Sequence, residues 1–174
     1  CCLWVRHPHE AEGMAKTRRH PRYLAHAELP AGVEIAHDLA AIRAAYPDLV
    51  IAVPSAHFNA LLAHLAPLPE SSRVLWATKG LEPATGRFLS EVFAERFPAI
   101  AHGILSGPSF AAEVAAGRPT AVTVAANEPG FATDMARVFS GESFRVYTSN
   151  DLIGVQLGGA VKNVLAIAAG IADG

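Results

Sequence analysis

The sequence predicts an α/β fold with a Rossmann-like, doubly wound and mostly parallel sheet. Three observations predict it. Short apolar runs alternate with longer helical patterns, 51% of the 174 residues are hydrophobic against 17% charged, and chemically reactive side chains follow the short runs. A regular alternation of strand and helix is typical of parallel βαβ units, and such sheets bind ligands at the carboxyl ends of their strands.

Seven short runs have the length and composition of strands. They are Cys2 to Val5, Val33 to Ala36, Leu49 to Val53, Val74 to Ala77, Gly103 to Ser106, Thr120 to Ala125 and Phe144 to Thr148. Seven strands indicate a sheet and not a helical bundle.

Six helical patterns lie between these runs, and several open with Asp, Ser or Pro, which favour helix starts. They cover about Pro8 to Arg19, Asp38 to Ala45, Ala56 to Leu65, Thr85 to Phe97, Pro108 to Ala116 and Pro129 to Ser140. From about Ser149 the chain reads as one long buried helix opened by "SND", a plausible cap. We therefore predict a first domain over residues 1–148 and the start of a second over 149–174.

Composition excludes several classes of partner. The formal charge is −2, and the one basic cluster, Lys16 to Arg22, is short, so we expect no nucleic-acid binding. Cys1 and Cys2 are the only cysteines; adjacent residues rarely form a disulfide, so a reducing cytoplasm is expected. The apolar stretch Leu157 to Ala172 is shorter than the about 20 residues of a membrane span and carries a central lysine. The histidines show no metal-ligand spacing, so no metal site is expected.

Polar or turn-forming residues follow four of the predicted strands: Arg6 and His7, Pro54 and Ser55, Lys79 and Gly80, and "GPSF". Lys79 comes after "VLWAT", and Gly107 and Ser109 lie in "SGPSF" after "GIL". If the next helix begins at Pro108, the free amides near Ser109 and Phe110 face a polar or anionic group. For each of these residues, ordinary turn formation is an equally good interpretation.

Lys162 stands in "GGAVKNVLAIAAG", a helix of otherwise small or apolar residues apart from the adjacent Asn163. One interpretation is a lysine whose stem packs on the helix while its ammonium reaches water. Another is an acid–base group, because partial desolvation lowers a lysine's pKa toward the working pH. Gly158 and Gly159 lie one turn earlier, so a substrate or another backbone can approach this face.

Several segments together resemble bacterial NAD(P)-dependent glycerol-3-phosphate dehydrogenases. They are "LWVRHPHE", "DLVIAVPS", "WATKGLEPATGR", "LSGPSFAAEVAAGRPTAVTVA" and "FRVYTSNDLIGVQLGGAVKNVLAIAAGIADG", in that order through nearly the whole chain. The resemblance implies an oxidoreductase that interconverts glycerone phosphate and sn-glycerol 3-phosphate by hydride transfer with NAD(P)H, for glycerophospholipid synthesis. It also favours a homo-oligomer.

The resemblance assigns a role to each candidate residue. Lys162 is implied as the general acid and base and as a substrate ligand, beside Asn163, which orients neighbouring polar groups. Residues implied to contact the substrate are Lys79, Gly107 and Ser109, and those implied to contact the cofactor are Arg6, His7, Tyr23, Lys79 and Ala112. Because Arg6 and His7 stand where an acidic residue selects NAD, NADP should be accepted.

The sequence departs from the family's pattern at both ends. The family opens with a strand and a G-x-G-x-x-G turn, which this sequence lacks, and it continues into a helical substrate domain. We therefore expect an interior fragment of a dehydrogenase, with a gap where a central strand belongs and little activity on its own. The alternative is a catalytically inactive remnant that acts as an interaction or assembly module through its exposed last helix.

Overall fold

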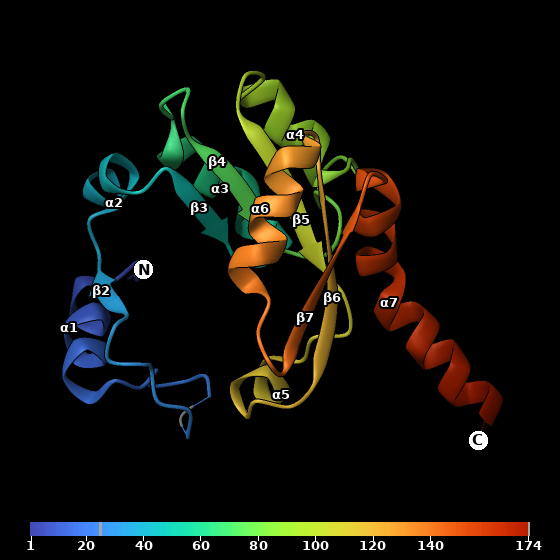
Figure 1. The fold of residues 1–174 in the computed structure, drawn as a ribbon, viewed down its shortest axis with the longest axis horizontal. Coiled ribbons are helices and arrows are strands. Elements are labelled where there is room, and N and C mark those ends of the chain that lie inside the picture. The colour runs from blue at the N-terminus through green and yellow to red at the C-terminus, as the bar shows by residue number, and fades with distance from the viewer. Residues whose placement is uncertain (25, 174) are drawn as a thin grey trace.

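A computed structural model describes residues 1–24 and 26–173, and the side chains of all of these except 163–166. Strands and helices alternate along the described chain (Figure 1). The strands are β1 (Cys2–Trp4), β2 (Glu34–Ala36), β3 (Asp48–Ile51), β4 (Arg73–Trp76), β5 (Ala101–Ser106), β6 (Thr120–Ala126) and β7 (Phe144–Ser149). The helices are α1 (Pro8–Thr17), α2 (Leu39–Ala45), α3 (Ser55–Leu65), α4 (Leu89–Arg96), α5 (Ala111–Ala115), α6 (Pro129–Phe139) and α7 (Leu152–Asp173).

The seven predicted strands are all present, but they form two sheets. A five-stranded sheet has the order β3-β4-β5-β6-β7, and a separate two-stranded sheet pairs β1 with β2. All neighbouring strands are parallel except β5 and β6, which are antiparallel. The predicted mostly parallel α/β fold is therefore confirmed.

The connection between the antiparallel strands β5 and β6 contains the short helix α5. The sequence predicted a helix over Pro108 to Ala116, whereas α5 spans only Ala111–Ala115 and buries none of its residues. A crossover between parallel strands usually needs a helix that packs on the sheet. The five-residue α5 does not pack on the sheet in this way, and β6 returns beside β5 in the opposite direction.

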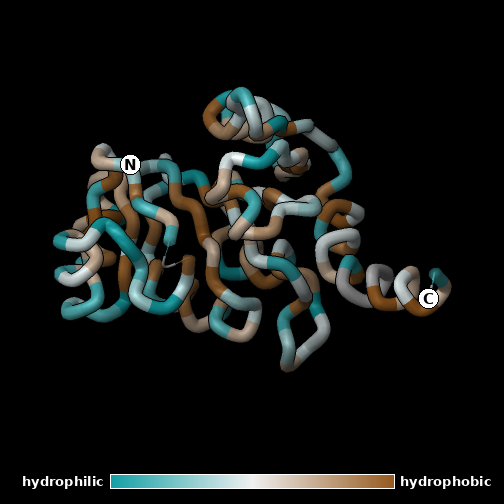
Figure 2. Tube along the Cα trace, turned by 90° about the horizontal axis from the view of Figure 1, so that it is seen from below, coloured by the Kyte–Doolittle hydropathy of each residue, from teal (hydrophilic) through white to brown (hydrophobic). Residues whose placement is uncertain are grey.

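The main core lies between the five-stranded sheet and helices α3 and α4. Trp76 of β4 is fully buried, and its ring contacts Phe58 of α3 and Phe93 of α4 at centroid distances of 5.5 and 5.6 Å. A second cluster covers the other face under α6, which contributes Phe131 and Met135. Figure 2 shows hydrophobic segments both in the body of the molecule and along the helix that leads to the C-terminus. Helices on both faces make the sheet doubly wound.

A buried polar contact anchors the start of α7 to α4. The Gln156 side-chain amide donates to Ser90 Oγ at 2.7 Å, and the Ser90 backbone N–H donates to Gln156 Oε1 at 3.1 Å. Both residues are buried, at 3% and 5% exposure. Beyond this anchor α7 extends away from the sheet (Figure 1). The axes of the segments Leu152–Lys162 and Ile167–Asp173 differ in direction by 53°. No single described helix is long and apolar enough to cross a membrane.

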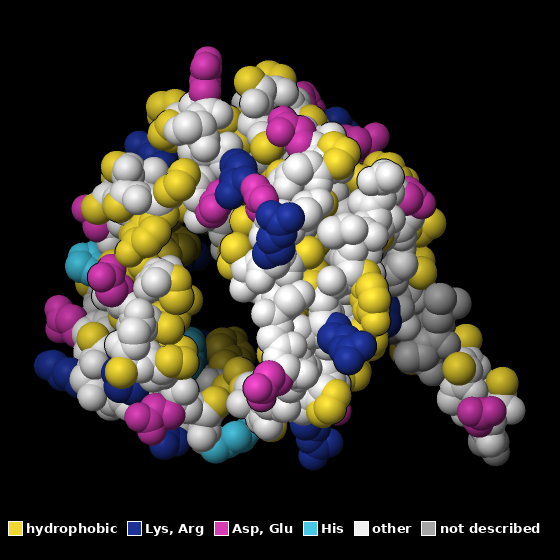
Figure 3. All heavy atoms as spheres, in the orientation of Figure 1, with side chains coloured by type: hydrophobic (Ala, Val, Ile, Leu, Met, Phe, Trp, Pro, Cys, Tyr) yellow, Lys and Arg dark blue, Asp and Glu magenta, His cyan; other side chains and the backbone are white. Residues whose placement is uncertain are grey.

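The two sheets leave an opening between them. Figure 3 shows it between the unit of β1, α1 and β2 and the rest of the molecule, with hydrophobic side chains at its rim. Strand β1 carries Leu3, 36% exposed, and β3 carries Val50, 51% exposed. Strands inside parallel sheets normally bury both faces. The described strands thus form two separate sheets, with partly exposed apolar side chains on β1 and β3.

Candidate functional site

The Lys79 ammonium is held by the turn that follows β5. Lys79 lies three residues after the end of β4, and Lys79 Nζ donates to the Gly107 carbonyl at 2.9 Å and to Ser109 Oγ at 3.3 Å. Strands β4 and β5 are parallel neighbours, so their carboxyl ends meet at one edge of the sheet. The structure thus brings together three of the residues predicted to contact the substrate.

The electrostatics of Lys79 are unusual for a lysine. Its pKa is lowered, first by burial and second by the positive charge of Lys162. Two ammonium groups that repel each other in a partly buried site favour an anion between or beside them. The arrangement can therefore attract a phosphate or stabilise a developing alkoxide.

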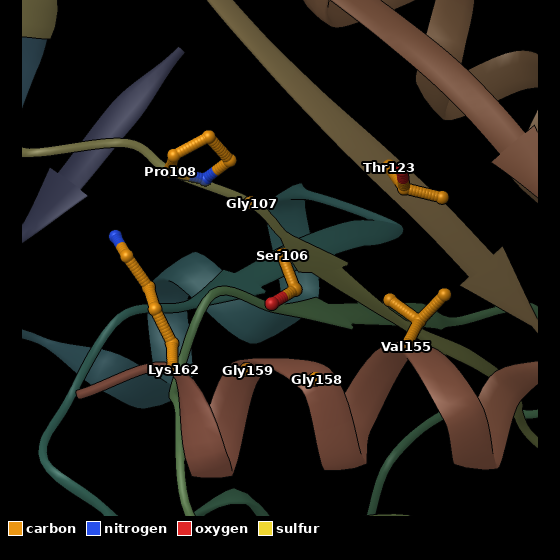
Figure 4. Close-up of a pocket in the computed structure, with 8 residues that line it drawn as sticks. All are labelled: Ser106, Gly107, Pro108, Thr123, Val155, Gly158, Gly159 and Lys162. Atoms are coloured by element: carbon orange, nitrogen blue, oxygen red, sulfur yellow. The ribbon is translucent and has the colours of Figure 1, made fainter. Parts of the chain in front are cut away.

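Lys162 lines a cavity of about 240 Å³ beside this turn. Figure 4 shows its side chain rising from α7 toward Pro108, opposite the ends of β5 and β6. The cavity is lined by Ser106, Gly107, Pro108, Thr123, Val155, Gly158, Gly159 and Lys162. The Lys162 ammonium also lies over the ring of Phe110, 4.3 Å from the ring centroid.

The two glycines before Lys162 have different surroundings. A Cβ on Gly159 would lie 2.5 Å from Ser106 Oγ, so a side chain there would require the Ser106 hydroxyl to move. A Cβ on Gly158 would meet nothing within 4 Å, and Gly158 faces the cavity. One glycine permits the helix to approach the strand, and the other leaves space for a ligand.

The expected helix N-terminus at Pro108 is wrong. The Ser109 N–H donates to the Gly107 carbonyl at 2.9 Å, and Phe110 is the residue before α5. The Ser109 amide is therefore occupied inside a tight turn and does not point at a ligand from a helix end. Gly107 is needed for strand packing, since a Cβ there would lie 2.8 Å from the Ala121 carbonyl of β6.

The residues predicted to contact the cofactor lie in different parts of the molecule, with Lys79 at the turn described above. His7 and Tyr23 line a polar cavity of about 560 Å³ at the end of β1, together with Pro8, His9, Glu10, His20 and Arg22. Arg6 is exposed and does not line this cavity, although it precedes His7 directly. Ala112 is exposed on α5.

Sequence reasoning missed several residues of the site. Ser106, Thr123 and Val155 line the Lys162 cavity, and Arg22 and His20 line the cavity near Tyr23. Ser106 and Phe110 could have been predicted as site residues, because they flank the candidate residues Gly107 and Ser109 in the sequence. Thr123 had none, because its place depends on the antiparallel pairing of β6 with β5, which puts it opposite Ser106. The side chain of Asn163 lies outside the described residues.

Among the described residues, no group of three or more His, Cys, Asp or Glu side chains could hold a metal ion. The polar side chains that line the Lys162 cavity are the Lys162 ammonium and the hydroxyls of Ser106 and Thr123, and the Lys79 ammonium is bonded to Gly107 of the cavity wall.

Comparison with known proteins identifies the family. A model described as the NAD-dependent glycerol-3-phosphate dehydrogenase N-terminus matches residues 1–132, and the model of the C-terminus matches residues 151–174. Proteins named glycerol-3-phosphate dehydrogenase (NAD(P)+) from Alkalilimnicola ehrlichii and Nitrosococcus oceani are 53% and 52% identical over 99% of this chain. The chain spans about half the length of these curated relatives, 52% and 51%.

Solved structures agree with the sequence comparison. The crystal structure of glycerol-3-phosphate dehydrogenase from Coxiella burnetii is 39% identical and superposes with a TM-score of 0.89, covering 99% of this chain and 53% of that one. A Plasmodium falciparum structure of the same name, at 23% identity and a TM-score of 0.89, shows the same fold. The chain belongs to the NAD-dependent glycerol-3-phosphate dehydrogenase family.

Proposed function

We propose that this chain carries the hydride-transfer site of an NAD(P)-dependent glycerol-3-phosphate dehydrogenase, which interconverts glycerone phosphate and sn-glycerol 3-phosphate. The observation that carries the proposal is the pair of ammonium groups: Lys79, bonded to Gly107 and Ser109, and Lys162, on the cavity wall nearby. The names of the relatives supply the reaction, and this geometry supplies groups that suit it.

The proposed roles follow from the charges that appear during ketone reduction. NADPH or NADH, when bound, supplies the hydride. Lys162 Nζ donates a proton to the oxygen that becomes the alcohol, and takes it back in the oxidation direction. Lys79 Nζ, fixed by two acceptors, stabilises negative charge on the substrate. Gly107 and Ser109 lie at the substrate end of this cluster.

The proposed cofactor site begins at the polar cavity near the end of β1. Its aromatic and basic side chains fit an adenosine with a phosphate: the rings of Tyr23 and His20 lie 5.0 Å apart, and Arg22 and His7 line the same cavity. Arg6 adds positive charge beside His7, and Ala112 on α5 leaves room for the cofactor. No carboxylate replaces Arg6, so we infer that NADP is accepted.

The proposal extends to the domain boundaries, the cellular location and the oligomeric state. We infer that residues 1–148 form the cofactor domain and residues 149–174 begin the helical substrate domain. We infer a cytoplasmic enzyme of glycerophospholipid synthesis, which the two free cysteines Cys1 and Cys2 suit. We infer a homo-oligomer, because Ile167 and Ile171 of α7 are 65% and 77% exposed.

The same exposed helix supports the second candidate, a catalytically inactive remnant that acts as an interaction or assembly module. A kinetic test separates the two. In a chimera, this chain replaces the matching segment of the Alkalilimnicola ehrlichii relative, so that the relative supplies the flanking residues. A chimera that reduces glycerone phosphate with NADPH supports the enzyme, and a folded but inactive one supports the remnant.

In this chimera, Lys162→Ala should lower kcat by about a hundredfold or more, the usual scale for a positioned acid–base group. The matched control is Lys16→Ala, because Lys16 is exposed on α1 and is the remaining lysine of the chain. Steady-state kinetics with glycerone phosphate and NADPH measure both. Near-normal turnover of a folded Lys162→Ala protein would remove Lys162 from the mechanism.

A further inference from the structure

Phe110 has no packing role that explains its position. It directly precedes α5, and its side chain is 60% exposed. The helix that follows buries none of its residues. A large exposed aromatic side chain near the cavity that Lys162 lines points to a contact outside the core.

The contact it makes is with Lys162. The Lys162 ammonium lies over the face of the Phe110 ring, 4.3 Å from the centroid. The face of an aromatic ring is electron-rich, and a cation within about 6 Å of the centroid is attracted to it. A lysine side chain has a flexible four-carbon stem, so such a contact restricts where its ammonium can lie.

The same short turn also holds the other ammonium. Gly107 and Ser109 accept hydrogen bonds from Lys79 Nζ, and Phe110 is the next residue. Lys79 and Lys162 are like charges and repel each other; the pKa of Lys79 is lowered first by burial and further by the charge of Lys162. Without the ring, repulsion would drive the more flexible Lys162 ammonium away from the cluster.

We propose that Phe110 is a positioning residue: its ring holds the Lys162 ammonium, so that the turn 107–110 sets the separation of both cations. The proposal rests on the proposed function of Lys162 as proton donor. It adds that proton transfer requires an aromatic face at position 110 and not merely an apolar side chain.

The test compares side chains of similar size with and without an aromatic face, in the Alkalilimnicola ehrlichii chimera. Phe110→Leu should lower kcat about five- to tenfold while the KM for NADPH changes less than twofold. Phe110→Tyr and Phe110→Trp should restore kcat to within about twofold of the parent. Val114→Ala is the matched control, since Val114 is an exposed apolar residue of α5, and it should leave kcat unchanged.

A second readout does not depend on turnover. In the parent chimera, NMR should show Lys162 side-chain methylene protons shifted upfield by the ring current of Phe110. The shift should disappear in Phe110→Leu and persist in Phe110→Tyr. A parent spectrum without this shift would overturn the contact itself.

The outcomes separate this inference from the function on which it rests. If Lys162→Ala abolishes turnover while Phe110→Leu, Phe110→Tyr and the parent have equal kcat, only the role of Phe110 is overturned. If Lys162→Ala keeps normal turnover, the proton-donor assignment fails and the role of Phe110 falls with it. If Phe110→Leu raises the KM for NADPH and leaves kcat unchanged, Phe110 contacts the cofactor and the positioning role is wrong.

Discussion

His102 places a titratable ring inside the main core. The side chain is 5% exposed, stacks on Trp76 at 5.9 Å and packs against Phe93 at 5.0 Å. Its Nδ1 lies 2.9 Å from the Ile100 carbonyl. Burial lowers the pKa of His102, while the hydrogen bond to Ile100 and the charge of Glu128 oppose this in part. The folded protein therefore favours the neutral ring.

This lowered pKa predicts a loss of stability in acid. The unfolded chain takes up the proton near pH 6.5, before the folded protein does, so the stability contributed by His102 is present above about pH 6.5. It is lost as the pH falls through the lower folded pKa. Urea unfolding of the chimera at pH 7.5 and 5.5 should show a larger loss of unfolding free energy in the parent than in His102→Gln. Equal losses in both would contradict the prediction.

Arg6 is the residue that should decide cofactor choice. It is exposed at the end of β1, beside His7, which lines the polar cavity. A carboxylate at this position repels the 2′-phosphate of NADP and binds the ribose hydroxyls of NAD. In the chimera, Arg6→Asp should shift the ratio of kcat/KM for NADPH over NADH by about tenfold or more toward NADH. The control Arg145→Asp changes an exposed arginine on β7. A ratio that moves equally in both variants would show that Arg6 acts only through net charge.

The stability of helix α7 should respond in opposite directions to changes at the adjacent Gly158 and Gly159. Gly159 packs on Ser106, and an added methyl group would overlap its hydroxyl, so Gly159→Ala should lower the unfolding free energy by about 1–3 kcal/mol. A methyl group on Gly158 would meet no atom within 4 Å. Gly158→Ala should therefore raise the unfolding free energy by about 1 kcal/mol, because alanine has the higher helix propensity. Urea unfolding of both variants in the chimera checks the signs. Adding Ser106→Ala to Gly159→Ala should restore part of the lost unfolding free energy. If the double variant recovers none of it, contact with the Ser106 hydroxyl is not the cause of the loss.

The elements that the sequence predicted well are those with strong local signals. Strand β6 was predicted as Thr120 to Ala125 and observed as Thr120–Ala126, because a run rich in β-branched residues favours a strand locally. The helix expected from Pro108 was wrong, because its hydrogen bonds are taken by the turn at Gly107. The direction of β6 and the partner of Ser106 are tertiary features, and no spacing in the sequence encodes them. Lys79, Gly107 and Ser109 were predicted separately, while their mutual hydrogen bonds required the structure.

At the scale of the whole molecule, the two sheets are the feature that limits function. Strands β1 and β3 belong to different sheets, and in the described chain no strand joins them. The proposed cofactor residues His7 and Tyr23 belong to the two-stranded unit, whereas Lys79 belongs to the five-stranded one. A cofactor that must contact both units binds tightly only if their relative position is fixed, since fixing it on binding costs free energy.

We therefore expect the 174-residue chain on its own to bind NADPH weakly or not at all, to show no dehydrogenase activity and to self-associate. Self-association should proceed through α7, whose Ile167 and Ile171 are exposed beyond the sheet. Fluorescence titration with NADPH and light scattering of the same samples measure both properties, with the chimera as the reference that binds. The double variant Ile167→Glu, Ile171→Glu should lower the average mass without restoring binding, because it changes the helix surface and not the gap between the sheets. A monodisperse monomer that binds NADPH with low-micromolar affinity would mean that the two units already hold a fixed relative position without a strand between them.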